Sequence, residues 1–427
     1  MDRNLSPAPI GNTISPCSMP QLRLPGGGVI GAVFIVCRSN GGRNFDDLLD
    51  DWFIESLKSY TDLHVYQLDR PTRVIEWTSD KTVCVAGYSS SKNDIFGAAL
   101  PLKLFADENK GLCAERDFKV VHGWFLMAPV HCLRHVPGTR CVVTNDGLSN
   151  SLQVWELDGD DIDVIRRTGS IEGSVSDSGR GSRIAARLWS RPEVLHGAES
   201  GAVQLTALAT RQTTYRQEMD SSDPLSSLQF VSDTVFLTGC CNGSFYLTDT
   251  RTSAPPQLSP PPVASRGGNH TLVGTCSLGP SSSELSCRVV RLSSSGQAVV
   301  SDLRRPGGTL CQVQLDVQTR HCNIDDVTVS WAPVMDNCIA VSGFNGAVQI
   351  YDTSAWRVEL HEAKPLFQHH GHVVSPQCSD DGIFITSHVW HPERRRTLLS
   401  AASDGSVHVW DWVDQSAADA SNSHMGQ

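Results

Sequence analysis

The chain has 427 residues, which is long enough for two or three ordinary domains or for one large architecture. Hydrophobic residues make up 40% of it, which is enough to bury a substantial core, and wholesale disorder is excluded. The 35 lysines and arginines against 46 acidic residues give a net charge of −11, which makes an autonomous binder of DNA or RNA backbone a poor candidate.

Residues 1–44 have the composition of turns and loops, so we expect a disordered leader or an alternative start there. The apolar run at 29–37 is about nine residues long, whereas a membrane span needs roughly 18, and the small-residue cleavage pattern of a signal peptide is missing. We therefore expect no membrane association. The glycines at 26–31 match G-x-G-x-x-G formally, but they lack a preceding strand and a following helix, so no cofactor is expected.

Residues 45–62 predict a short amphipathic helix. Acidic residues open this segment and a lysine lies near its end, which is the order that complements the helix dipole. Leu49, Trp52, Phe53 and Leu57 fall on roughly one face. We expect this face to pack on the main body of the protein; binding of a partner by the helix is the alternative.

From residue 63 onward the pattern changes to short strands separated by turns, and similar segments recur. Each begins with a turn residue, continues as an alternating apolar strand and usually ends near an Asp; these segments are 150–157, 200–208, 242–250, 295–303, 345–353 and 404–412. Their spacing is roughly fifty residues, close to that of propeller blades. Asn-Gly and Asp-Gly pairs mark two-residue hairpin turns before several of them.

Upstream of these segments lie further strands, so that each unit supplies four antiparallel strands, the signature of a β-propeller blade. Segments 309–316 and 364–370 are predicted to be outer, fourth strands. A further unit over residues 72–104, with its last strand near residue 104, brings the count to seven. The segment at 64–69 can then complete the last blade and close the ring. The expected organisation is an all-β, seven-bladed propeller over residues 63–414 with a disordered tail at 415–427.

The 14 cysteines are scattered, and no C-x-x-C pair occurs. Most lie inside apolar runs. We therefore expect reduced thiols that act as small core residues in a cytosolic or nuclear protein, rather than disulfides or a metal site.

The last unit resembles the WD-repeat family, with Gly371-His372 before it, Asp404-Gly405 in its hairpin turn and Trp410-Asp411 at its end. The other units are degenerate versions of the same pattern. The resemblance implies a hydrogen-bonded blade network of His372, Ser400, Asp404 and Trp410, with Asp411 completing the repeat.

Longer blocks, such as 72–77, 387–392 and 407–414, resemble one particular group within that family. This resemblance implies a non-enzymatic scaffold or adaptor, a monomeric propeller within larger complexes. It implies a role in microtubule and spindle organisation during cell division, with tubulin or spindle proteins as partners. The implied location is cytoplasmic, with the spindle, spindle poles and cleavage furrow in mitosis. The alternative is an assembly or stabilising factor for the RNA-cleaving module of Integrator, with its endonuclease subunits as partners.

Few residues suggest chemistry. Arg394, Arg395 and Arg396 form a run between two predicted strands that could clamp an acidic tail of a protein partner; a solvated turn is the alternative. His370 and His372 would share one face of a strand, yet no Cys or carboxylate stands at a partnering spacing, so we expect no metal site.

The segments predicted to line the centre of the ring offer only two further reactive groups, Glu76 and His388. A propeller hydrolase with its site in the central channel would need such residues. Since nothing else completes a catalytic set, we expect no catalytic residues, and the enzyme remains the weaker hypothesis.

Overall fold

The structure is a computed structural model of residues 1–427. The residues that it describes are 30–31, 58–68, 70–79, 81–88, 93–100, 119–157, 165–174, 179–187, 191–262, 275–278, 287–305, 308–317, 326–374 and 382–413. The expected leader, apart from two residues, lies outside these ranges, and so do residues 45–57 of the expected helix and the tail at 415–427.

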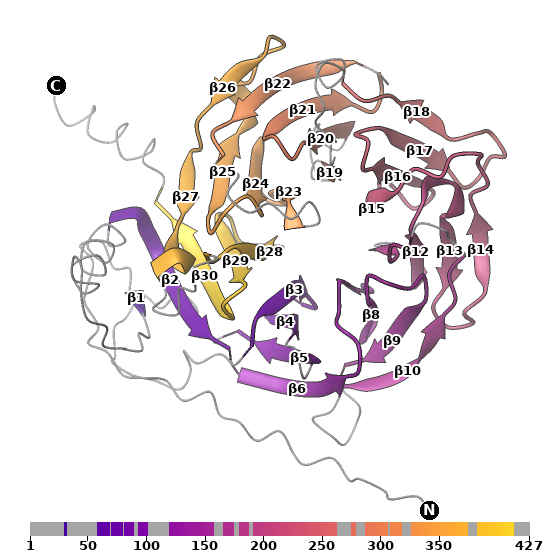
Figure 1. The fold of residues 1–427 in the computed structure, drawn as a ribbon, viewed down its shortest axis with the longest axis horizontal. Helices are drawn as coiled ribbons and strands as arrows, with labels where there is room; N and C mark the ends of the chain where they lie inside the picture. Colours follow the sequence, from indigo (N-terminus) through magenta and orange to yellow (C-terminus); the bar gives the residue numbers. More distant parts are fainter. Residues whose placement is uncertain are drawn as a thin grey trace, which may run out of the picture.

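Seven β-sheets stand around a central channel, so the predicted all-β, seven-bladed propeller is confirmed (Figure 1). We number the blades in sequence order, with the innermost strand of each named first. Blade 1 contains β3 (Thr72–Trp77), β4 (Thr82–Gly87), β5 (Asn93–Ala99) and β6 (Lys119–Leu126). Blade 2 contains β7 (Cys132–His135), β8 (Cys141–Asn145), β9 (Leu152–Glu156) and β10 (Arg166–Ile171). Blade 3 contains β11 (Arg183–Ala186), β12 (Glu193–Gly197), β13 (Gln204–Ala207) and β14 (Thr213–Arg216).

The remaining blades follow the same order. Blade 4 contains β15 (Leu225–Phe230), β16 (Val235–Cys240), β17 (Phe245–Asp249) and β18 (Gln257–Ser259). Blade 5 contains β19 (Thr275–Leu278), β20 (Arg288–Leu292), β21 (Gln297–Asp302) and β22 (Thr309–Leu315). Blade 6 contains β23 (Thr328–Trp331), β24 (Cys338–Ser342), β25 (Val348–Asp352) and β27 (Phe367–His369). Blade 7 contains β28 (Ile385–Trp390), β29 (Thr397–Ala402), β30 (Ser406–Trp412) and β2 (Tyr60–Gln67).

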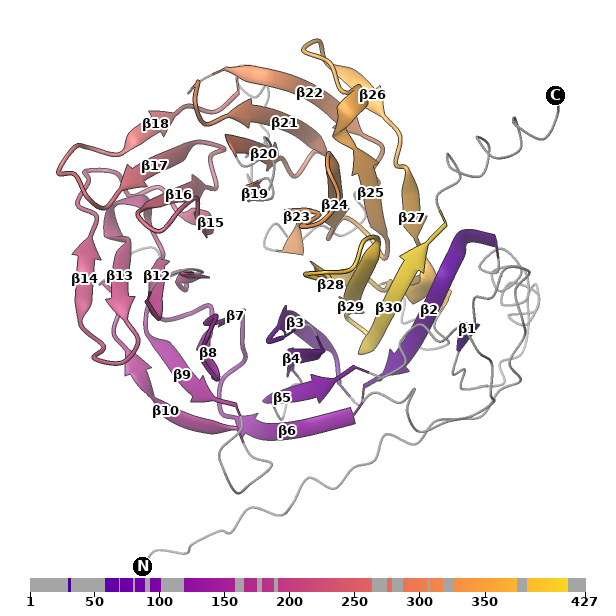
Figure 2. The same cartoon turned by 180° about the vertical axis from the view of Figure 1, so that it is seen from behind.

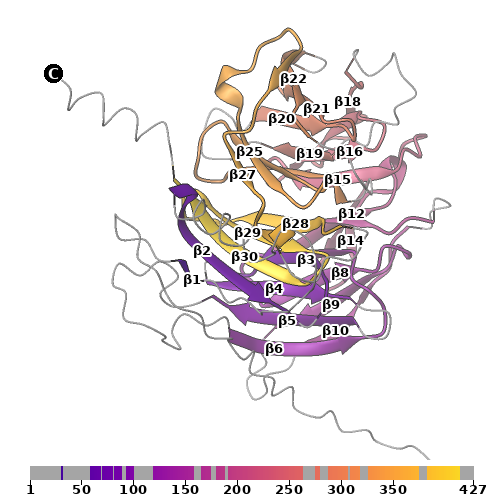
Figure 3. The same cartoon turned by 60° about the vertical axis from the view of Figure 1, so that its left-hand side comes forward.

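Closure of the ring joins segments that are distant in the sequence. Strand β2 runs antiparallel to β30, with Leu63 opposite Trp410, so the N-terminal side supplies the outer strand of the last blade, as predicted (Figure 2). The side view in Figure 3 shows the indigo β2 lying along the yellow β30. The strand already begins at Tyr60, so the last three residues of the expected helix at 45–62 are strand instead. Two leader residues, β1 (Ile30–Gly31), pair in parallel with the outer edge of β2.

Two outer strands differ from the prediction. The outer strand of blade 1 is β6, so the placement of a last strand near residue 104 was wrong. Strand β26 (His361–Ala363), which the sequence did not suggest, leaves blade 6 and pairs in parallel with β22 of blade 5. Polar residues and a three-residue length gave this strand no recognisable alternation.

The hairpin turn between β29 and β30 shows why glycine follows Asp404. Gly405 has a φ of +86°, a conformation that favours glycine, and a Cβ there would lie 2.6 Å from the carbonyl oxygen of Arg70. This turn therefore packs against the end of β2, where Leu68 donates its backbone N–H to the Gly405 carbonyl.

The core is divided into layers between neighbouring blades. Val290 and Val313 of blade 5, for example, belong to one cluster with Ile339 of blade 6. At the seam, Tyr60, Trp390, Trp410 and Trp412 pack with apolar residues of blade 6. Cysteines such as Cys84 and Cys338 are buried in these layers, and the eight cysteines whose side chains the structure describes are free thiols.

Helical structure within the described ranges is limited to Lys58 and Ser59, which lie in the expected helix at 45–62, and to short 3₁₀ turns. The 3₁₀ turns are η2 (Ser200–Ala202), η6 (Thr353–Ala355) and η7 (Gly371–Val374). No helix in these ranges has the length and apolar character that a membrane crossing requires.

Candidate functional site

Four of the residues that the sequence singled out meet inside blade 7, linked by a fifth. The Trp410 Nε1 lies 3.1 Å from the Ser400 hydroxyl, and that hydroxyl lies 2.8 Å from Nε2 of His372. The other ring nitrogen of His372 lies 2.6 Å from the Ser406 hydroxyl, which in turn lies 2.6 Å from Oδ1 of Asp404. These five side chains form one continuous series of hydrogen bonds, which we call the blade-7 relay.

The direction of each bond in the blade-7 relay follows from the chemistry of its ends. The Ser406 hydroxyl has a single proton and donates it to the Asp404 carboxylate, so Nδ1–H of His372 must donate to Ser406. Nε2 of His372 is then an acceptor, and the Ser400 hydroxyl donates to it. Burial lowers the pKa of His372 to about 3, so the ring is neutral near pH 7 and this arrangement is self-consistent.

Asp404 also fixes the hairpin turn itself. Its Oδ1 accepts the backbone N–H of Ser406 at 2.9 Å, and its backbone carbonyl accepts from the amide of Gln67 at 2.8 Å. Gln67 lies in the closing strand β2, so the turn that ends the relay is tied to the seam of the ring. The sequence missed Ser406, although its position two residues after an Asp in a tight turn is typical of an Asx-type turn.

His369 and His408 extend the buried polar cluster at the seam. The Tyr60 hydroxyl lies 2.7 Å from Nδ1 of His369, and Nε2 of His369 lies 3.0 Å from Nδ1 of His408. His369 is the hydrogen-bond partner of the Tyr60 hydroxyl within the described residues, so this hydroxyl donates its single proton to Nδ1. Nε2 of the neutral His369 ring then carries the proton and donates it to Nδ1 of His408. Burial, reinforced by the neighbouring histidines, holds the pKa of His369 well below its ordinary value.

The three buried histidines stand close enough to consider a metal ion. The ligand atoms of His369, His372 and His408 lie within 4.8 Å of one another. However, Ser400 already occupies the lone pair on Nε2 of His372, and Tyr60 occupies that on Nδ1 of His369.

The expected pairing of His370 with His372 on one strand face is wrong, because η7 interrupts the strand and His370 points to Gln368 at the surface.

The arginine run occupies the hairpin between β28 and β29, as the sequence indicated, but its members play different parts. The positive charges of Arg394 and Arg396 act on Asp411, and both lower the pKa of its carboxyl group. Burial outweighs them and raises the pKa of Asp411 to about 6. Arg395 is exposed and donates from Nε to the Val334 carbonyl of blade 6 at 3.3 Å. Arg394 is exposed as well, so Arg394 and Arg395 both correspond to the solvent-facing cations that the clamp hypothesis requires.

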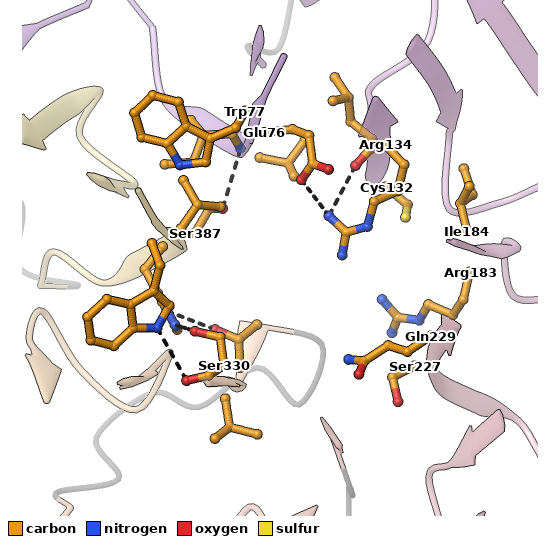
Figure 4. A pocket seen from close by; sticks show the side chains of 18 of the residues that line it. Glu76, Trp77, Cys132, Arg134, Arg183, Ile184, Ser227, Gln229, Ser330 and Ser387 are labelled. Carbon is orange, nitrogen blue, oxygen red and sulfur yellow. Dashed lines mark hydrogen bonds and ion pairs between the residues drawn. The ribbon is translucent and has the colours of Figure 1, made fainter. Parts of the chain in front are cut away.

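A pocket of about 500 Å³ opens in the central channel (Figure 4). The inner strands of blades 1, 2, 3, 4, 6 and 7 line it. Glu76 and His388 both belong to this lining, as the sequence suggested, but each is engaged. Glu76 forms an ion pair with Arg134 at 2.8 Å.

His388 joins blade 7 to blade 6. Its Nδ1 lies 2.7 Å from the Ser342 hydroxyl, and its Nε2 lies 2.7 Å from the Ser330 hydroxyl. Burial lowers the pKa of this ring to about 4, so it is neutral near pH 7. The side chain is thus placed to hold two inner strands together rather than to transfer a proton to a substrate.

Arg73 ties non-adjacent blades together at the start of the inner strands. It pairs with Asp326 at 2.9 Å, although blade 7 lies between blades 1 and 6 in the ring. Its second nitrogen donates to Nδ1 of His131 at 3.1 Å, and because arginine can only donate, that imidazole nitrogen is an acceptor.

Two arginines of the pocket, Arg134 and Arg183, were not singled out from the sequence. Arg134 is the third residue of β7, and Arg183 is the first residue of β11. The signal that could have identified them is a cation on an otherwise apolar innermost strand of a propeller, whose alternate side chains face the channel.

Seven sheets closed by β2, together with the His–Ser–Trp hydrogen bonds of blade 7, define a WD-repeat β-propeller. A comparison with models of known protein families finds no match. Individual relatives are clear: the sequence is 47% identical over 371 residues to Integrator complex assembly factor WDR73 of Danio rerio, covering 86% of this protein and 98% of the relative.

Other relatives carry the same name. The Homo sapiens protein is 40% identical over 375 residues, which cover 86% of the present sequence and 98% of the relative. The Mus musculus protein is 37% identical over 374 residues, which cover 87% of the present sequence and the whole of the relative. The protein belongs to the WDR73 family.

Proposed function

We propose that this propeller is a non-enzymatic scaffold that helps to assemble the Integrator complex by holding its protein subunits. The observation that carries the proposal is the similarity, over nearly the full length of the relatives, to proteins named for Integrator assembly. This supports the alternative drawn from the sequence, with the endonuclease subunits as the partners to test first. The spindle role and the cytoplasmic and spindle location stay predictions.

The chemistry of the described residues supports a scaffold rather than an enzyme. Glu76 is neutralised by Arg134, and His388 has both ring nitrogens in hydrogen bonds to serines of blade 6. The buried histidines at the seam between blades 6 and 7 are likewise engaged within the fold. A propeller with its reactive side chains committed to its own blades offers partners a rigid surface.

Depletion and rescue in cells test the assembly function. We expect acute loss of the protein to reduce the amount of Integrator endonuclease subunits that co-purify with the rest of the complex, and re-expression of the wild-type protein to restore it. Undiminished co-purification after complete depletion would contradict the proposal. Tubulin is measured in the same purifications, because its presence without Integrator subunits would favour the spindle role.

Arg395 allows the proposed contact with a partner to be tested at the surface of the propeller, with a second exposed arginine as the control. We propose that it contacts an acidic partner, since it is exposed and held by a single bond to Val334. Arg395→Glu should weaken rescue, whereas Arg251→Glu should not, because Arg251 is an exposed arginine on a different blade whose charge Asp249 already neutralises at 2.7 Å. Equal rescue by both variants would remove Arg395 from the interface.

A further inference from the structure

The outer strands of blades 2 and 3 lie side by side at the rim of the propeller. Strand β10 ends the sheet of blade 2 and β14 ends that of blade 3, so both are edge strands among the described residues (Figure 1). The turn before β14 contains Arg211, whose guanidinium donates to the Thr168 carbonyl of β10. Gly169 has no side chain and so leaves the space that this guanidinium occupies. An exposed arginine of blade 3 therefore reaches the edge of blade 2.

Arg216, at the end of β14, also faces blade 2. It lies directly opposite Gln204 of β13, and opposite residues of an antiparallel pair point to the same face of a sheet. The amide of Gln204 donates to the hydroxyl of Ser174, which follows β10 in blade 2. Arg216 is exposed, so its charge lies at the surface on the same side as that of Arg211.

Arg166 faces this region from the other blade. Its neighbour Arg167 lies opposite Trp155, which packs in the layer between blades 1 and 2, so Arg167 faces blade 1. Successive residues of a strand point to opposite faces, and Arg166 therefore faces blade 3. We call Arg166, Arg211 and Arg216 the basic rim.

Positive charge is in excess at the basic rim. Strands β10 and β14 and the turn at 208–212 contain no acidic residue. Arg166 pairs with Glu156 at 3.1 Å, but its side chain is 73% exposed and such surface pairs are weak. No carboxylate of the described residues forms an ion pair with Arg211 or Arg216. Two acidic residues follow the ends of the strands without pairing to these arginines; they are Glu172 and Glu218. In a protein with a net charge of −11, the basic rim is a local reversal of sign.

The residues of the basic rim favour a peptide over nucleic acid. Single-stranded nucleic acid is held largely by bases stacked on aromatic side chains. Tyr215 is the only aromatic residue of β10 and β14, and its ring packs on Phe236 with centroids 6.0 Å apart. An extended peptide can instead use the backbone groups of an edge strand together with carboxylate–guanidinium pairs.

We infer that the basic rim binds an extended acidic segment of a protein partner, whose carboxylates pair with Arg211 and Arg216. An extended chain places every second side chain on one face, about 6.6 Å apart. Strand β14 has four residues and is therefore about 13 Å long, so a segment with acidic residues at alternate positions can reach both arginines. This recognition is independent of which complex the protein assembles.

Purified full-length protein and two fluorescein-labelled peptides test the recognition. In one peptide Glu alternates with Thr over nine residues; in the other, Gln replaces each Glu, and Thr favours the extended chain in both. Dissociation constants are measured by fluorescence polarisation at low ionic strength and again at about 0.15 M salt. We expect the Glu peptide to bind at least about tenfold more tightly than the Gln peptide at low ionic strength, and this difference to shrink in salt.

Arg211→Gln and Arg216→Gln remove the charges and keep polar side chains. Each should weaken binding of the Glu peptide at least about threefold and leave the Gln peptide unchanged. The double variant Arg211→Glu, Arg216→Glu should lose the Glu peptide and bind a peptide in which Lys alternates with Thr. The Arg216 side chain makes no hydrogen bond to the described residues, so Arg216→Glu alone replaces the double variant if the latter has a lower melting temperature.

Two exposed arginines elsewhere on the propeller are the matched controls. Arg251→Gln, on blade 4, removes a guanidinium that Asp249 neutralises at 2.7 Å. Arg395→Gln removes the exposed arginine of the blade 7 hairpin. Both variants should keep the dissociation constant of the Glu peptide within about twofold of the wild-type value. A loss confined to Arg395→Gln would move the acidic recognition to that hairpin and overturn the inference.

Other results would also overturn it. They are equal affinity for the Glu and Gln peptides, unchanged binding after charge reversal at the basic rim, and binding of a uridine octanucleotide at least about tenfold tighter than that of the Glu peptide. So would peptide binding that appears only after the aspartates before β10 are changed to Asn, because the protein's own chain would then be the occupant. Those aspartates lie outside the described residues and are Asp158, Asp160, Asp161 and Asp163. The Integrator assay in cells uses none of these peptides, so the two proposals can fail separately.

Discussion

The Tyr60 hydroxyl donates to Nδ1 of His369 across 2.7 Å, although the two residues are 309 positions apart in the sequence. Tyr60 belongs to the closing strand β2 of blade 7, whereas His369 belongs to the outer strand β27 of blade 6. The bond therefore fastens the closed seam to the neighbouring blade, beside the stacked rings of His369 and Trp410, whose centroids are 4.6 Å apart.

Tyr60→Phe should lower the melting temperature. The variant removes the donor to a buried imidazole nitrogen, and such an unpaired acceptor costs about 1–3 kcal/mol. Thermal unfolding followed by circular dichroism measures the effect. Tyr88→Phe, at a half-buried tyrosine outside the seam, serves as the control, and an equal loss in both variants would count against a special role of the seam bond.

Ser400→Ala should be more damaging than its small change in volume suggests. Ser400 is both the acceptor for Trp410 and the donor to His372, so the substitution leaves two buried polar groups without partners. We expect a loss of about 2–4 kcal/mol of unfolding free energy. Ser354→Ala, at an exposed serine, should change stability by less than about 0.5 kcal/mol. Equal stability of the two variants would show that the blade-7 relay contributes nothing.

Stability should fall as the pH drops below 6.5. Burial lowers the pKa of His388 in the folded protein to about 4, while the same histidine in the unfolded protein takes up a proton near 6.5. The unfolded state thus binds more protons between these values, and each such histidine costs about 1.4 kcal/mol per pH unit. His388→Gln should flatten this dependence between pH 6.5 and 4, and His361→Gln, at the rim, should not. Parallel pH profiles for wild type and His388→Gln would refute this account.

Asp411→Asn should raise the melting temperature at neutral pH. The pKa of Asp411 is raised to about 6, so the folded state loses stability as the pH rises from 3.8 through 6 and the buried carboxyl becomes charged. Removing the charge should recover about 1–2 kcal/mol at pH 7.5, after allowance for partial solvent access, and nothing at pH 3.5. Asp352→Asn tests the equivalent position of blade 6, where the side chain is exposed and caps η6. A gain that is the same at both pH values would exclude the titration mechanism.

Much of the ring could be predicted because hairpin chemistry is local. The blades could be identified from the spacing of the units and from hairpins such as the Asp404-Gly405 turn, which is followed by an alternating strand at 406–412. The closing strand could be identified from the apolar segment at 64–69. The outer strands were harder. Among the described strands, β6 pairs only with β5, and it follows a connection whose length the sequence pattern did not reveal.

The polar cluster at the seam shows where local patterns fail. Residues 367–372 look like one strand, but β27 ends at His369 and η7 turns His372 inward. His370 and His372 therefore do not share a strand face. His408 joins them from β30, thirty-nine residues from His369, and no spacing rule links the two. The direction of the hydrogen bonds, and with it the charge state of the rings, depends on these long-range contacts.

The pairing of β2 with β30 also sets the order of events during synthesis. The ribosome releases β2 as the first strand of the ring and β30 as the last of its strands, so β2 has no partner for its antiparallel edge until nearly the whole propeller has been made. At roughly 5–20 residues per second, that interval is on the order of tens of seconds. During this interval Tyr60 and Leu63 lack the tryptophans that later bury them. The antiparallel edge of β2 is then open to pairing with other strands, which makes it a site of misassembly before the ring closes.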